Sequence, residues 1–212
     1  MYGAQLVWNA KWSSRLASSL GIAGFDIAHR NMLTTANVPY INQGNTLKAG
    51  GLLVDNFNPV IGDASVTYTL DTFPLYNGAF PIKLAGEFMN NPGAGSQSSG
   101  YWGGITFGKS GKKGLWDLSY RYEYLEANAW FDQLVDDDNV GLYAASPTGA
   151  PAGSTGFFGG TGVKGSLIKA NYSITDGLTF TFTCYLNDLI DPVPSGSKTD
   201  AMHVMADLMW KF

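Results

Sequence analysis

The sequence predicts an all-β fold of antiparallel strands, and three observations lead to this prediction. Aromatic residues make up 14% of the chain, glycine accounts for 27 of its 212 residues, and only 14% of the residues are charged. Several segments alternate apolar and polar residues with a period of two, as a strand with two different faces does. No apolar run approaches the roughly 18 residues that a membrane helix needs. Together these features favour a β-barrel over a helical domain.

The first two predicted strands lie at the N-terminus. Alternation over residues 2–12 predicts a strand of about ten residues, the length of a tilted membrane strand. After a tight turn at Ser13 and Ser14, a second strand over residues 15–27 loses its alternation near Gly24, as at a β-bulge. The polar residues 28–62 then predict a long loop, with a short hairpin at residues 47–54.

Seven further strands follow the same pattern. The turn Asn77-Gly78 between two alternating runs is a strong hairpin signal. In residues 116–124, tryptophan, leucine and tyrosine alternate with charged residues and serine, which no helix would keep on separate faces. The predicted strands cover residues 65–71, 80–88, 101–107, 116–124, 168–172, 178–186 and 202–212. With the first two, this makes about nine strands.

The connections alternate between short and long. Short ones fall at residues 13–14, 72–79, 110–114 and 174–177, and longer ones at 28–62, 91–100, 127–160 and 188–200. Short turns on one rim and long loops on the other are typical of antiparallel transmembrane β-barrels. Because bacterial barrels have even strand numbers and the N-terminus lacks a secretory signal, we expect residues 1–212 to be one barrel domain from the C-terminal part of a longer protein.

The two faces of the predicted strands differ in charge. A charge that faces lipid at the membrane centre costs about 2 to 4 kcal/mol, so the charged face is predicted to line a water-filled interior. The predicted pore-lining residues are Lys11, Lys83, Glu87, Asp117, Arg121, Glu123, Lys169, Asn171, His203 and Asp207. The predicted aromatic girdles at the membrane interfaces include Trp12, Phe80, Trp116, Tyr122, Tyr124, Trp210 and Phe212. A soluble β-sandwich or lipocalin-like barrel would also alternate, but about a quarter of its residues would be charged.

Several segments carry a family resemblance. The last strand has apolar or aromatic residues at Leu208 and Trp210 and ends on Phe212, which resembles the C-terminal signal that the barrel-assembly machinery recognises. Residues 80–88, 102–109, 114–122 and 169–179 resemble the C-terminal half of a family of bacterial outer-membrane porins. The likeness covers most of residues 55–212, and members of that family are longer and carry a signal peptide. The resemblance implies an integral outer-membrane protein through which small hydrophilic solutes diffuse passively.

Charge adds an expectation about selectivity. The predicted long loops carry more acidic than basic residues. They should therefore concentrate cations at the entrance of the predicted barrel, and we expect the channel to prefer cations mildly. Residues 127–160 are the loop most expected to fold inward as a constriction. The expected partners are outer-membrane lipid, the assembly machinery, small solutes and ions, and no nucleic acid; a homo-oligomer is left open. The alternative function is a small non-conducting barrel that acts as a structural anchor or adhesin.

Enzymatic and cofactor chemistry finds little support. The chain has two histidines, His29 and His203, and neither is accompanied by a recognisable nucleophile motif, so we expect no enzyme. The glycines at 159–162 lack the Gly-Lys-Ser/Thr of a phosphate loop. The acidic run at 136–138 lacks the spacing and glycine of a calcium loop. We therefore expect no cofactor and no metal, and we interpret Cys184 as a small apolar side chain facing lipid.

Overall fold

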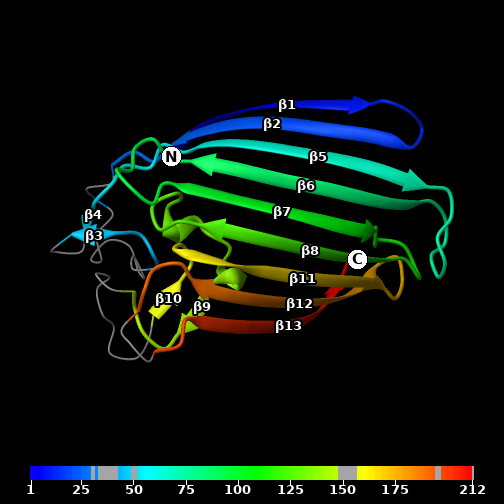
Figure 1. Ribbon diagram of the computed structural model, residues 1–212. Coiled ribbons are helices and arrows are strands. Elements are labelled where there is room, and N and C mark those ends of the chain that lie inside the picture. Colours follow the sequence, from blue (N-terminus) through cyan, green and yellow to red (C-terminus); the bar gives the residue numbers. More distant parts are fainter. Residues whose placement is uncertain (30–31, 33–42, 49–51, 148–156, 194–196, 212) are drawn as a thin grey trace.

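Most of the chain forms one antiparallel sheet. A computed structural model describes residues 1–29, 32, 43–48, 52–147, 157–193 and 197–211. Nine long strands pair in chain order as one curved sheet (Figure 1). They are β1 (Tyr2–Lys11), β2 (Leu16–Asp26), β5 (Val60–Leu70), β6 (Phe80–Asn90), β7 (Ser99–Gly108), β8 (Trp116–Leu125), β11 (Val163–Ser173), β12 (Leu178–Leu189) and β13 (Asp200–Trp210). The predicted all-β class and the nine antiparallel strands are therefore confirmed.

Small elements lie in the long connections. The predicted hairpin at residues 47–54 is present as β3 (Leu47–Lys48) paired with β4 (Leu52–Leu53). The connection after β8 contains two 3₁₀ turns, η2 (Asp132–Leu134) and η3 (Asp137–Asn139), and the paired strands β9 (Gly141–Tyr143) and β10 (Phe157–Gly159). Within the described ranges, no helix has the length and apolar character needed to cross a membrane.

The register of β2 corrects one prediction. Gly24 pairs with Ala4 of β1 on one side and with Val60 of β5 on the other, and the pairing runs residue to residue without interruption. The predicted bulge near Gly24 is therefore wrong. The alternation weakens there because Ala23 and Gly24 are too small to reveal which face each residue occupies.

The three longest connections lie at one end of the sheet, as predicted, whereas the connection after β6 (residues 91–98), predicted as long, is slightly shorter than the turn after β5 (residues 71–79). Because successive strands are antiparallel, the turns after β1, β5, β7 and β11 share one end, which we call the short-turn end. The connections after β2, β6, β8 and β12 share the other, the long-loop end (Figure 1). Parts of the predicted loops 28–62 and 127–160 lie outside the described residues.

The register also separates two faces. Odd-numbered residues of eight strands and even-numbered residues of β7 share what we call the inner face. The opposite, outer face carries large apolar side chains that are exposed, for example Leu6 at 72%, Leu84 at 58% and Val204 at 49%. The sheet therefore presents a broad apolar surface on its outer side, and Cys184 lies on that side.

Closure of the predicted barrel is not found. β1 and β13 are the two edges of the sheet, and no pairing joins them in the part of the chain that the structure describes. With nine antiparallel strands, β1 and β13 run in the same direction. Antiparallel closure would therefore need an odd number of further strands between these two edges.

Buried side chains gather at the two ends of the sheet. At the long-loop end, one cluster contains Leu53, Phe57 and Phe131, and another contains Tyr143, Phe157, Val163 and Leu189. At the short-turn end, Phe80 is fully buried and stacks on Phe73 with ring centroids 4.0 Å apart. Tyr76 and Trp116 complete this aromatic cluster. Phe80, predicted as part of the interfacial girdle, therefore exposes no surface, because the turn before β6 folds over its ring.

Candidate functional site

The ten predicted pore-lining residues all lie on the inner face. The register brings together residues that are up to about two hundred positions apart in the chain, because every strand keeps the same alternation. The set comprises Lys11, Lys83, Glu87, Asp117, Arg121, Glu123, Lys169, Asn171, His203 and Asp207. The structure thus gives these residues one common wall, and their role in a pore stays a prediction.

Part of this wall is a row of acidic residues. Asp63 and Glu87 are direct cross-strand partners, and Trp102 stands between Glu87 and Glu123 in the same row. Like charges placed directly opposite each other across a strand pair repel. Sequence reasoning missed Asp63 as a wall residue, although the alternation of β5 could have placed it there.

Arg121 places a positive charge next to this acidic row, two residues before Glu123 on the same face of β8. Its guanidinium lies 2.9 Å from a carboxylate oxygen of Glu123 and 5.6 Å from the centre of the Trp102 ring. Arg121 is opposite Gly104 on β7. Because glycine carries no side chain, the arginine has room to lie along the wall toward Trp102.

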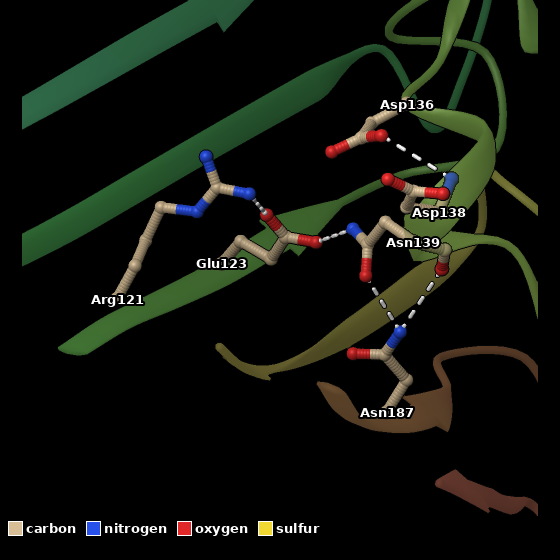
Figure 2. Close-up of polar contacts among 6 residues, drawn as sticks. All are labelled: Arg121, Glu123, Asp136, Asp138, Asn139 and Asn187. Carbon is tan, nitrogen blue, oxygen red and sulfur yellow. Dashed lines mark hydrogen bonds and ion pairs between the residues drawn. The ribbon is translucent and has the colours of Figure 1, made fainter. Parts of the chain in front are cut away.

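The connection after β8 docks on this wall. Figure 2 shows Asn139 of η3 between two strands: its side-chain amide donates to Glu123 on β8, and Asn187 on β12 donates to both its backbone and side-chain oxygens at 3.1 and 2.8 Å. Nearby, the Asp138 amide donates to Asp136 at 3.2 Å, and His203 Nδ1 lies 2.8 Å from the Asp138 carbonyl oxygen. The segment at residues 130–139, which we call the docked segment, therefore folds inward, as predicted for part of loop 127–160.

A cavity remains between the docked segment and the wall. It has a volume of about 280 Å³, which is near the lower end of the range for small-ligand pockets. Its lining includes Glu87, Trp102, Arg121 and Glu123 from the strands and Trp130, Asp136 and Asn139 from the docked segment.

No family model matches this chain, and a search of curated proteins finds no match. The resemblance to outer-membrane porins therefore stays a prediction. The geometry of the wall, the docked segment and the cavity carries the functional argument instead.

A buried polar network holds the long loops together above the wall, and sequence reasoning missed it. Asn45 donates to the carbonyl oxygens of Ala127 at 2.6 Å and Trp130 at 2.8 Å, and accepts from the Asp132 amide at 2.9 Å. A second centre, Asn128, accepts from the Thr46 amide and donates to the Thr46 hydroxyl. We call this the rim network; its buried members are Asn45, Asn91, Asn128, Asp132 and Thr161.

Asp132 is the charged member of the rim network. One carboxylate oxygen accepts from the amides of Gln43 and Asn45, at 2.9 and 3.3 Å, while the other has no hydrogen-bond partner within the described residues. The side chain has no exposed surface. Burial disfavours the charged form and raises the pKa of Asp132 to about 6, although hydrogen bonds from Gln43, Asn45 and Gln133 oppose this shift.

The predicted girdle residues occupy both ends of the outer face. Trp12 and Trp210 are exposed near the short-turn end, and Trp116 is half-buried there beside Phe80. Tyr122 and Tyr124 lie on β8 toward the long-loop end, where Tyr124 stacks on Tyr101 at 5.3 Å. Phe212, which belongs to both the girdle and the assembly signal, lies outside the described residues; Leu208 of that signal is exposed.

Neither histidine forms part of a recognisable catalytic arrangement in the described ranges. His29 follows β2 with a positive φ of 62°, and His203 contacts a backbone carbonyl and stacks beside Tyr185. The described residues contain no group of three or more side chains suited to hold a metal ion. The inner face and the cavity present charged and aromatic side chains.

Proposed function

We propose that this chain forms part of the wall of an outer-membrane porin, with lipid on the outer face and water on the inner face. The observation that carries the proposal is the contrast between the two faces of one sheet. Exposed leucine, valine and aromatic residues cover the outer face, and the charged residues along the middle of the strands share the inner face. Charged residues of the strands that fall on the outer face lie at the long-loop end: Asp26, Lys164, Asp188 and Asp200. A soluble protein would have to leave this large apolar surface in water.

The strand dimensions fit this proposal. The nine strands contain ten to twelve residues each, and a tilted transmembrane strand needs about nine to eleven. Aromatic side chains stand near both ends of the outer face, where an interfacial girdle would lie.

A complete pore needs both edges of the sheet to be covered. Two copies with the same membrane orientation would bring β1 of one copy beside β13 of the other in parallel, because these strands run in the same direction. Antiparallel closure therefore favours additional strands in odd number over a barrel made of such copies, although porins with closed barrels can still associate into oligomers.

The first test asks whether the outer face meets lipid. Leu84 is exposed on the outer face of β6 and pairs with Val66 of β5. Ser65, the residue before Val66, lies on the inner face. In phospholipid vesicles, Leu84→Arg should lower the free energy of unfolding by about 2 to 4 kcal/mol. Ser65→Arg, the control, should change it by about 0.5 kcal/mol or less. Equal effects of the two changes would contradict the membrane assignment.

The second test measures conduction by the natural protein in planar bilayers. A porin should give steady channels, and the reversal potential under a KCl gradient should show mild cation preference. Replacing Arg121 and Lys169 with glutamine should strengthen that preference, because each change removes a positive charge from the wall. Permeability ratios that stay unchanged would argue that neither residue lines a pore, and clear anion selectivity of the wild type would end the charge argument.

The anchor or adhesin function is the second candidate, and one observation favours it. The docked segment occupies space over the inner face and bonds to Glu123 and Asn187 there. A barrel filled by its own loops and side chains conducts nothing. Absence of steady channels from correctly inserted protein would support this candidate and overturn the pore.

A further inference from the structure

The cavity under the docked segment is lined by acidic and aromatic groups. The charged and aromatic side chains that face it from the inner face and the docked segment are Glu87, Trp102, Arg121, Glu123, Trp130 and Asp136. Three carboxylates thus face one guanidinium among the described lining residues. The cavity therefore has an excess of negative charge, which comes from Glu87 and Glu123 on the sheet and from Asp136 on the docked segment.

The one cation among the described lining residues is already engaged. Arg121 is paired with Glu123 at 2.9 Å. Glu87 and Asp136 form no ion pair within the described residues, and Asp63 stands directly opposite Glu87. A cation that entered the cavity would therefore lower the repulsion between Asp63 and Glu87.

The aromatic groups favour an organic cation. The face of Trp102 already accepts a guanidinium at 5.6 Å, inside the range of cation–π attraction. Trp130 adds a second indole, which is fixed by a hydrogen bond from its ring nitrogen to the Leu134 carbonyl at 3.2 Å and by an edge contact with Phe25 at 5.5 Å. Indole rings attract ammonium groups that carry apolar substituents, which bare metal ions lack.

We propose that this cavity binds a small organic cation, an ammonium compound with an apolar or hydroxylated body. The proposal adds a class of solute to the proposed porin function. Transport of the organic cation rests on that function, whereas binding of the cation does not. Acidic residues of the sheet and of the docked segment would attract the ammonium group. The indole rings of Trp102 and Trp130 would contact the body of the solute.

Binding can be measured by calorimetric titration of the natural full-length protein in detergent. The probe is choline, and 3,3-dimethyl-1-butanol is the neutral molecule of the same shape. Choline should bind saturably and the alcohol should not. Glu87→Gln and Asp136→Asn should each weaken choline binding by about tenfold, and Trp102→Leu, which changes no charge, should also weaken it.

The matched control is Asp200→Asn, which removes the same charge at the long-loop end, outside the cavity lining. It should alter choline affinity by no more than about twofold, since a distant exposed charge is screened. Equal affinity for choline and the alcohol would overturn the site, and so would an equal loss in Asp200→Asn and Asp136→Asn. Choline binding by a protein that forms no channels would overturn the porin function and support the binding site. Channels without choline binding would support the porin function and overturn the binding site.

Discussion

Asp132→Asn tests whether the rim network contains a buried acid that weakens it at high pH. The ordinary value of this carboxyl group is 3.8, and burial raises the pKa of Asp132 to about 6 in the folded protein. A difference of about two pKa units corresponds to about 3 kcal/mol between the neutral and charged forms. The neutral acid is therefore the form that the folded loops prefer.

The sign of the pH dependence follows from this difference. Because the folded pKa lies above the unfolded one, the stabilising contribution is fully present below about pH 4 and is lost as the pH rises through about 6. From pH 8 down to pH 4, the free energy that holds the loops closed should rise by about 2 to 3 kcal/mol. Asparagine keeps an oxygen for the amides of Gln43 and Asn45 but does not titrate, so Asp132→Asn should remove this part of the slope.

Hydrogen exchange of the Gln43 and Asn45 amides measures this opening directly, because both amides donate to Asp132. After correction for the intrinsic pH dependence of exchange, the wild type should show increasing protection toward low pH, and Asp132→Asn should show much less. Asp200→Asn, an exposed acid outside the network, should keep the wild-type slope. Identical slopes in the wild type and Asp132→Asn would refute the assignment of the pH dependence to this carboxyl group.

Two further predictions concern stability at the two ends of the sheet. Asn45→Ala should leave several buried partners unsatisfied and destabilise the loops by about 2 to 4 kcal/mol, measured as faster proteolysis at the long-loop end with the strands still protected. Phe80→Ala should lower the free energy of unfolding in vesicles by about 3 to 5 kcal/mol, because it empties a fully buried site, whereas Leu75→Ala in the same turn should change little. A small effect of Phe80→Ala would show that the turn does not cover this ring.

The strands could be predicted because alternation is a local property. In β8, Tyr120 and Tyr122 lie on the outer face and Arg121 and Glu123 on the inner face, as the period of two requires. Each strand repeats this signal over about ten residues, so strand number, order of connections and the shared wall all follow from the sequence. The same signal did not show that a turn would fold over Phe80.

The rim network could not be predicted because its contacts are distant and aperiodic. Asn45 bonds to Ala127 across 82 positions, and Gln43 bonds to Asp132 across 89. Asparagine in a polar loop is usually a turn or solvated residue, and nothing local distinguishes one that will be buried. Docking of residues 130–139 was expected only as a general property of long loops, without the contacts through Asn139.

Arg121 and Lys169 differ in a way that makes their comparison informative. Arg121 pairs with Glu123, and Glu123 in turn accepts from Asn139 of the docked segment (Figure 2). Neutralising Arg121 therefore removes a wall charge and also frees a carboxylate that helps to hold this segment. Lys169 forms no ion pair within the described residues, so its neutralisation changes the charge alone. If both variants shift ion selectivity equally, charge governs the wall; if Arg121→Gln also alters conductance, the docked segment controls the width of the passage.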